Sequence, residues 1–305
     1  ITTASSNVAI GKEAMTSNVT NGRNVAIGQA ALRDMDSAGN AYNIGIGYAA
    51  GMTITTATQN TLIGGLAGDA LTTGGNNVAV GYNALSSEDT GGKNTAIGWN
   101  AMSSLDAGGN GNNVSVGFNS SNAMTTSVAS TIVGSEAGRD ITTGNYNTAL
   151  GYLALSSEEA GSHNVAIGYL ALEDQNTGND AYNIAIGSNA GKQITTGVRN
   201  VVVGGLAGDA ITTANYNTAL GYLALSSEDE GSHNVAIGYL ALEDQDAGVD
   251  AYNVAIGSSA GKQVTTGKEN VLIGGNTADS ITTGIRNVAV GHNALATEDD
   301  HGHNV

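Results

Sequence analysis

The chain has 305 residues, including 45 glycines but no proline and no cysteine, and its formal net charge is −17. The lack of cysteine excludes disulfides and thiolate metal sites, and the acidic balance argues against nucleic-acid binding, which needs clustered Lys and Arg. No apolar run approaches the ~20 residues of a membrane-spanning helix. Phe and Trp occur once each, so we expect a thin core of Val, Ile, Leu and Ala rather than a ring-rich globular core.

One motif, Asn-[Val/Ile/Thr]-x-[Ile/Leu/Val]-Gly, recurs along the whole chain. Its Asn stands at 7, 24, 43, 60, 77, 94, 113, 147, 164, 183, 200, 217, 234, 253, 270, 287 and 304. Ser130 fills the one gap. The intervals are 17 residues, except that every fourth is 19, so the full period is a 70-residue block. Residues 147–216 and 217–286 are identical at 51 of 70 positions, which indicates duplication of whole blocks.

Each repeat predicts one coil of a parallel β-solenoid, because Gly and β-branched residues oppose helix and the period is too short for helical repeats. In the copy at 164–168 we expect Val165 and Ile167 to face the core and Ala166 to point outward. A second short strand is expected over 152–155, with polar turns closing the coil. The array spans residues 1–305 as one domain. Because it begins with Ile1 and ends inside a motif, we interpret it as part of a longer fibre.

Stacking in register places each motif Asn on the next, which predicts an internal ladder of side-chain amides. The segment at 152–155 is apolar on both faces, so an apolar stripe is left outside the coil. We assign that stripe to the following residues: Tyr152, Leu153, Leu155, Tyr169, Leu170, Leu172, Tyr222, Leu223, Leu225, Tyr239, Leu240 and Leu242. A stripe of this size predicts burial against other copies in a parallel homo-oligomer, most simply a trimer.

The motif resembles the SVAIGxxAxA repeats of YadA-like trimeric autotransporter adhesin heads, and more closely the NTAIGYNAL-type repeats of bacteriophage tail fibres. The likeness is carried by residues 94–98 (NTAIG) and 81–85 (GYNAL), and it covers essentially the full chain. It implies a left-handed parallel β-roll with three chains side by side, in an adhesive head or a tail-fibre stalk. The coil of 17 or 19 residues and the four-coil block depart from the shorter adhesin-head repeat.

The 19-residue coils carry carboxylate and amide oxygens around a Gly turn, which resembles part of a calcium loop without its distal bidentate Glu. The candidate calcium ligands are Asp34, Asp36, Asp174, Asn176, Asp180, Asp244, Asp246 and Asp250. The competing interpretation is a solvated turn rich in Asp, Asn and Gly.

Other repeated polar residues favour structural roles. The acidic clusters at 88–89, 158–159, 228–230 and 298–300 recur without a surrounding cleft pattern, so a solvated, aggregation-blocking face is expected rather than glycosidase chemistry. His163, His233 and His303 share one repeat position and are expected to be turn residues, with ion binding across a trimer as the alternative. Adjacent Thr pairs do not fit an ice-binding array, and the Gly-Gly pairs lack the rest of a phosphate loop.

We therefore expect a non-enzymatic, extracellular structural protein without a cofactor other than calcium. The leading hypothesis is a phage tail-fibre stalk, a rigid oligomeric spacer whose flanking regions meet a host receptor or glycan. The alternatives are a bacterial surface adhesin head that binds a host ligand along its side, and a self-assembling extracellular filament. A glycan depolymerase is disfavoured because no coil carries an irregular insertion.

Overall fold

The structure, a computed structural model, describes residues 6–18, 20–297 and 302–305. These residues form 17 three-residue strands and no helix, and no described segment could cross a membrane as a helix. The chain divides into two compact units, Ile1–Asn147 and Thr148–Val305. The N-terminal unit holds β1 (Val8–Ile10), β2 (Val25–Ile27), β3 (Ile44–Ile46), β4 (Thr61–Ile63), β5 (Val78–Val80), β6 (Thr95–Ile97), β7 (Val114–Val116) and β8 (Thr131–Val133). The C-terminal unit holds β9 (Thr148–Leu150), β10 (Val165–Ile167), β11 (Ile184–Ile186), β12 (Val201–Val203), β13 (Thr218–Leu220), β14 (Val235–Ile237), β15 (Val254–Ile256), β16 (Val271–Ile273) and β17 (Val288–Val290).

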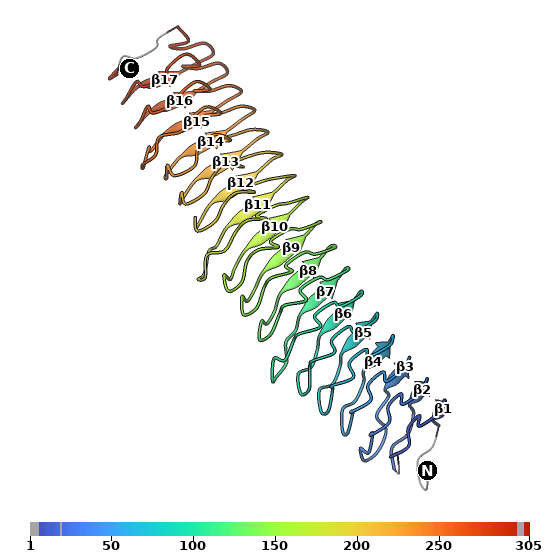
Figure 1. Cartoon of the computed structure of the whole chain (residues 1–305). Helices are drawn as coiled ribbons and strands as arrows, with labels where there is room; N and C mark the ends of the chain where they lie inside the picture. The colour runs from blue at the N-terminus through green and yellow to red at the C-terminus, as the bar shows by residue number, and fades with distance from the viewer. Residues whose placement is uncertain (1–5, 19, 298–301) are drawn as a thin grey trace. The chain divides into compact units, whose positions relative to one another are not determined.

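Each unit is a parallel β-solenoid, as the repeat predicts. Successive strands within a unit pair in parallel and in register, so that Val165 lies beside Ile184, and Ile184 beside Val201. Figure 1 shows these strands as successive rungs, each joined to the next by a long turn. The 17- and 19-residue intervals therefore correspond to single coils, and the two additional residues are accommodated in the turn.

The buried Asn ladder is confirmed, with the main chain as its principal partner. Asn200 is fully buried, and its side-chain oxygen accepts a hydrogen bond from the backbone N–H of Asn217 at 2.9 Å. Its amide nitrogen donates to the carbonyl of Ala214 at 2.8 Å and, less closely, to the Oδ1 of Asn183 at 3.3 Å. Asn200 thus closes its own coil and joins it to both neighbours, and Asn183 and Asn253 do the same. In the 19-residue coils the amide nitrogen differs, because that of Asn234 donates back to the carbonyl of Gly231 and that of Asn94 has no hydrogen-bond partner. The bonds that the side-chain oxygen accepts from the next coil explain why the Asn recurs.

The prediction of which strand residues face inward is wrong. Ala166 is fully buried, whereas Val165 and Ile167 on either side are half-exposed. The reason is the thinness of the coil. At the position equivalent to Ala166, the third coil has Gly45, and a Cβ added there would lie 2.8 Å from the Cγ of Leu32. The opposite wall comes so close to the strand that only a small side chain fits in most coils.

The predicted second strand over 152–155 is also wrong, because these residues form a turn. Leu153 and Leu155 have left-handed backbone conformations, with φ of 53° and 55°. Ala154 and Leu155 point into the coil and are fully buried, so the segment supplies the opposite wall of the core. The backbone of this turn still forms hydrogen bonds to the next coil, because the N–H of Leu155 donates to the carbonyl of Ala171.

The four-coil block has a packing explanation. Counted from the motif Asn, a coil with Leu or Met at position 8 carries a polar, Met or Leu side chain at position 11, as in Leu155 and Glu158. The next pair of coils carries Gly at position 8 and a branched residue at position 11, as in Gly191 and Ile194, except that Ser121 accompanies Met124 and Ala278 accompanies Ile281. A Cβ on Gly191 would lie 2.9 Å from the Cδ1 of Ile194, and its φ is +55°. The two arrangements fill the same space from opposite sides of the turn.

Candidate functional site

One glutamate in each of the described central blocks lies inside the coil, contrary to the expectation of a wholly solvated acidic face. Glu88, Glu158 and Glu228 are fully buried, while the adjoining acidic residues lie nearer the surface. The corresponding cluster at 298–300 lies outside the described residues. These glutamates occupy position 11 of the coil that precedes each 19-residue coil, where their carboxylates can reach the longer turn.

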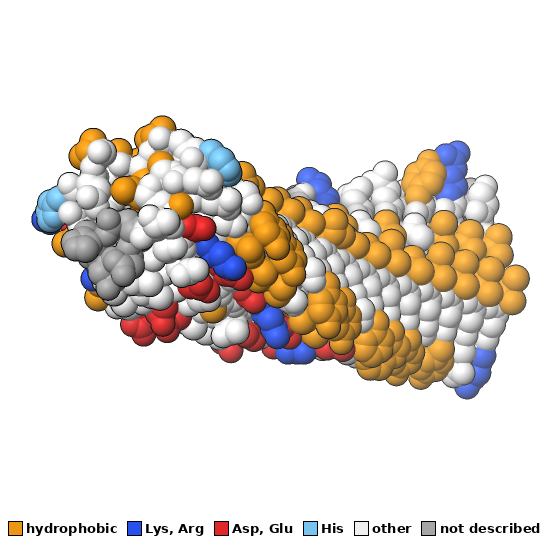
Figure 2. All heavy atoms as spheres, turned by 90° about the horizontal axis from the view of Figure 1, so that it is seen from above, with side chains coloured by type: hydrophobic (Ala, Val, Ile, Leu, Met, Phe, Trp, Pro, Cys, Tyr) orange, Lys and Arg blue, Asp and Glu red, His pale blue; other side chains and the backbone are white. Residues whose placement is uncertain are grey.

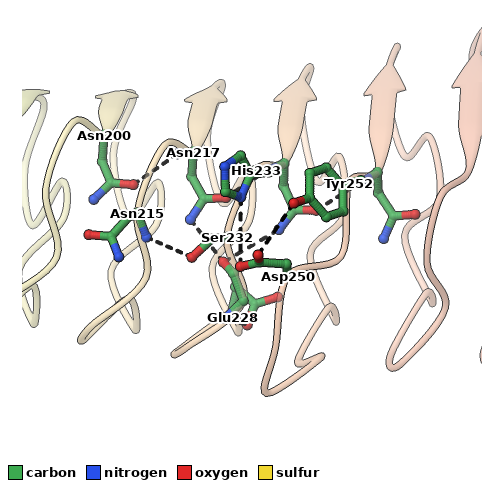
Figure 3. Close-up of polar contacts among 11 residues, drawn as sticks. Asn200, Asn215, Asn217, Glu228, Ser232, His233, Asp250 and Tyr252 are labelled. Carbon is green, nitrogen blue, oxygen red and sulfur yellow. Dashed lines mark hydrogen bonds and ion pairs between the residues drawn. The ribbon is translucent and has the colours of Figure 1, made fainter.

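Glu228 shows how the buried carboxylate is satisfied (Figure 3). Its Oε1 accepts the backbone N–H of Gly231 at 2.6 Å. Its Oε2 accepts the side-chain Nε2 of Gln245 at 2.8 Å and the backbone N–H of Ala247 at 3.4 Å, both from the next coil. Gln245 in turn accepts the Nδ2 of Asn253 on its Oε1 at 2.9 Å. The carboxylate therefore connects the turn of the 19-residue coil, at Gln245 and Ala247, to the Asn ladder at Asn253.

The same relay is present one block earlier, where Gln175 donates to Glu158 at 2.8 Å and accepts from Asn183 at 2.8 Å. The block before that has Leu105 in place of the glutamine. There Glu88 keeps only backbone donors, Gly91 at 2.5 Å and Ala107 at 3.1 Å. Burial raises the pKa of Glu88 although both N–H groups oppose the rise.

Two groups of three carboxylates have oxygens that all lie within 4.8 Å of one another in the described part of the chain. They are Glu88, Asp89 and Asp106, and Glu228, Asp229 and Asp246. Partial burial and the neighbouring Asp229 carboxylate raise the pKa of Asp246. Such an oxygen-only set has the chemistry to hold a hard divalent cation. In the equivalent third block, Asn176 replaces the aspartate, which removes one negative charge.

The predicted calcium ligands thus do not gather within their own turns. Asp246 meets carboxylates of the preceding coil, whereas Asp174 and Asp244 lie exposed at the beginning of the turn. Asp250 lies near the end of the turn, where its carboxylate accepts the Tyr252 hydroxyl at 3.4 Å. Asp180 has the same relation to its own tyrosine, Tyr182, at 3.5 Å.

In the first block, the corresponding positions differ again. Asp34 is paired with Arg33 through two hydrogen bonds of 2.7 Å, and these bonds lower the pKa of Asp34. Asp36 is exposed. Asn18 occupies the place of the buried glutamate beside Met35, and neither polar atom of its side chain has a hydrogen-bond partner. The first block therefore lacks the carboxylate relay.

The turn histidines form part of an exposed row of stacked rings. His233 lies between Tyr216 and Tyr252, with ring centroids 5.0 and 4.8 Å away, and its Nδ1 is 3.6 Å from the Asp250 carboxylate. Figure 3 shows His233, Tyr252 and Asp250 close together at the strand end. His163 stacks on Tyr182 at 4.8 Å. Ring contacts between coils account for this repeat position.

The exposed apolar surface is not the stripe expected from the sequence. Leu155, Leu172, Leu225 and Leu242 belong to the core, whereas Tyr152 and its equivalents are about half-exposed. The larger apolar surface is formed by the first and third residue of each strand, here called the outward rows. Their side chains are half-exposed or exposed, as Val201 (37%) and Ile186 (38%) illustrate. Figure 2 shows hydrophobic side chains in long rows, with the acidic side chains gathered apart from them.

Tyrosines and other rings flank the outward rows at both strand ends. Stacked pairs such as Tyr152 with Tyr169, at 5.8 Å, and Tyr222 with Tyr239, at 6.0 Å, follow the strands. The Gly-Gly pairs have a role here that the sequence comparison with phosphate loops did not find. A Cβ on Gly205 would lie 3.4 Å from the ring of Tyr222, so the glycine provides a flat support for that ring.

Comparison with protein-family models and with curated proteins gives no match to this chain. Three structural features bear on function: the buried ladders, the carboxylate relay and the outward rows. The relay could have been suspected from sequence, because Glu at position 11 alternates with Ile and Leu at the same position in other coils. A residue type that replaces core residues at a periodic site is itself a core candidate.

Proposed function

We propose that the chain is a structural spacer in an extracellular adhesive fibre, of the kind that phage tail fibres use to hold a host-binding region away from its base. The observation that supports this most is the uninterrupted self-similarity of the coils. Within each unit the strands pair in register with their neighbours, and motif residues such as Asn183, Asn200 and Asn217 form a ladder from coil to coil. Such quasi-one-dimensional stacking gives length in proportion to repeat number.

The ladders also suit a protein that must endure outside the cell without disulfides. Buried hydrogen bonds to side-chain amides join Asn183, Asn200 and Asn217 across successive coils, and the hydrogen bonds between the parallel strands run beside them. Hydrogen bonds in a dry interior are strong and polarise one another. A spacer of this design resists fraying except at its ends.

We further propose that three copies associate in parallel. The number three comes from the resemblance to trimeric adhesin heads and tail fibres, while the need for a partner comes from the exposed apolar rows. Light scattering on the purified chain should then give about three times the 30.3 kDa chain mass. A monomer that persists on dilution would contradict this part of the proposal.

Deletion of one block tests the spacer function. Removing residues 217–286 joins two equivalent coils and should shorten the fibre by about 19 Å, four coils of ~4.8 Å each. Attachment of the intact fibre to its host should persist, with the change seen as reduced length in electron micrographs. Removal of a single 17-residue coil is the matched control, because it breaks the four-coil packing. Loss of attachment after clean deletion of the block would favour an adhesin that binds along its side.

A further inference from the structure

We propose that the coil at residues 113–129, here called the serine coil, is a built-in weak point at which the stack opens before the equivalent coils of the other blocks. The coil and the residue that follows it hold five fully buried serines, which are Ser115, Ser120, Ser121, Ser127 and Ser130. The other three blocks have Ala or Gly at the first four of these positions and Asn at the fifth, as in Ala185, Ala190, Gly191, Gly197 and Asn200. A weak point of this kind is a property of the solenoid and is independent of the spacer function.

Ser121 opposes the closed coil in two ways. Its hydroxyl is fully buried and has no hydrogen-bond partner. Its φ is 50°, in the left-handed region, where the equivalent coil has Gly191 with a φ of 55°. A Cβ on Gly191 would lie 2.9 Å from the Cδ1 of Ile194, and the serine coil has the unbranched Met124 in place of that isoleucine. Opening the coil hydrates the hydroxyl and releases the backbone, so both effects favour the open state.

Ser115 and Ser120 place a second polar group in the core, between β7 and the turn opposite it. Their hydroxyl oxygens lie 2.7 Å apart, so each hydroxyl has the other as a partner. The only contact that the pair makes to the next coil is a long one, 3.5 Å from the Oγ of Ser120 to the carbonyl of Ile132. Alanine methyl groups at both positions would favour burial, whereas a hydroxyl can donate one hydrogen bond and accept two in water. The pair therefore contributes little that the open, hydrated coil lacks.

The amide ladder changes at the same place. The Oγ of Ser130 accepts the Asn147 N–H at 3.2 Å, and the Oγ of Ser127 donates to the Gly144 carbonyl at 2.5 Å. In the equivalent coil Asn200 alone provides both bonds, and its Nδ2 also lies 3.3 Å from the Oδ1 of the preceding motif Asn. Two hydroxyls thus replace one amide, and the direct amide-to-amide contact between coils is lost.

The three changes weaken one coil at its strand, its turn and its ladder together. In a stacked repeat protein each unit is stabilised by its own packing and by its two neighbours. A weakness that is confined to one unit lowers the free energy of local opening there and leaves distant coils folded. The serine coil is therefore expected to open as a local unit inside an otherwise closed stack.

Native-state hydrogen exchange on the full chain tests this difference without any substitution. The same backbone hydrogen bond occurs in both coils, from the Ser121 N–H to the Ala137 carbonyl and from the Gly191 N–H to the Ala207 carbonyl, each at 3.0 Å. After correction for intrinsic exchange rates, the Ser121 amide should exchange about 5-fold to 100-fold faster, the range expected for one unsatisfied buried hydroxyl. Equal protection of the two amides, or stronger protection at Ser121, would overturn the weak point.

Two matched variants identify the cause of the difference. The first gives the serine coil the core of its equivalent by four changes, Ser115→Ala, Ser120→Ala, Ser121→Gly and Met124→Ile. The amide of residue 121 should then be as protected as that of Gly191. The second makes the reverse changes in the coil at 183–199, namely Ala185→Ser, Ala190→Ser, Gly191→Ser and Ile194→Met. It should exchange faster at residue 191 and create a second weak coil.

The outcomes are distinct. A difference that persists in the first variant means that the core serines do not cause it, and the assignment of the weak point to them fails. Unchanged protection at residue 191 in the second variant contradicts it equally. If the second variant does not fold, the native comparison and the first variant still decide, because the first only restores residues that the chain already uses in this place.

Discussion

Replacement of Asn200 by alanine tests whether the buried amide ladder holds the coils together. The change removes the acceptor of the Asn217 N–H, at 2.9 Å, and the donor to the Ala214 carbonyl, at 2.8 Å. Both backbone groups are buried. An unsatisfied buried group costs about 1–3 kcal/mol, so the local free energy of opening should fall by about 2–6 kcal/mol.

The chain contains its own control for this change. Ser130 stands where the other coils have Asn, and its hydroxyl still accepts the Asn147 N–H at 3.2 Å. Asn200→Ser should therefore satisfy the Asn217 N–H and leave only the Ala214 carbonyl unpaired. The free energy of local opening should then fall by about half as much as in Asn200→Ala.

The appropriate assay is native-state hydrogen exchange, because stacked repeats need not unfold in a single step. The Asn217 amide should exchange about 30-fold to 10⁴-fold faster in the alanine variant, at tenfold for each 1.4 kcal/mol. The serine variant should lie between this and the native chain. Equal protection in all three proteins would mean that the ladder is a consequence of stacking and contributes little to it.

Three further predictions follow from the core and the carboxylates. Ala166→Ile should destabilise the chain by about 1–3 kcal/mol or more through overpacking, whereas Ile167→Asp should change the thermal melt of the monomer far less; the reverse order would restore the inward assignment of Ile167. Burial raises the pKa of Glu88, so the ionised carboxylate destabilises the folded state. The melting temperature should therefore rise as the pH falls through that pKa toward 4.5, and this rise should be smaller in the Glu88→Gln variant. If the two carboxylate groups hold calcium, a chelator should lower the melting temperature of the native chain, lower that of Asp246→Asn less, and leave that of the double variant Asp106→Asn with Asp246→Asn unchanged; identical melting temperatures of the native chain with and without chelator would exclude a stabilising ion.

The repeat determined the strand positions and the parallel register because the motif has a fixed length and only its Asn and Gly are nearly invariant. Alternation alone could not decide which face of the strand is inside. Val165 and Ile167 are larger and more apolar than Ala166, and pattern reasoning therefore placed them in the core. What decides the orientation is the short distance from the strand to the Leu side chains that the turn places in the core opposite it.

The candidate site was harder to predict for a related reason. Leu153 and Leu155 look like strand residues, but left-handed backbone conformations at both turn the segment inward. In the sequence Glu228 has the character of a surface residue, because the three donors that satisfy its buried carboxylate come from two different coils. Such long-range satisfaction of a charge leaves only a periodic substitution in the sequence, whereas the aspartates of the 19-residue coils resemble calcium ligands by their residue type and spacing.

The alternation of Leu at position 8 with Gly at the same position has a consequence for how such a chain can change its length. A coil with Gly191 needs a branched side chain at Ile194 and a neighbour of the other type, so single coils are not interchangeable parts. Recombination between misaligned copies of the gene preserves the packing only when the exchange is offset by a whole block. Chains built this way should therefore differ between variants in steps of four coils, and the 51 identical positions of 70 between residues 147–216 and 217–286 are what one such step would leave behind.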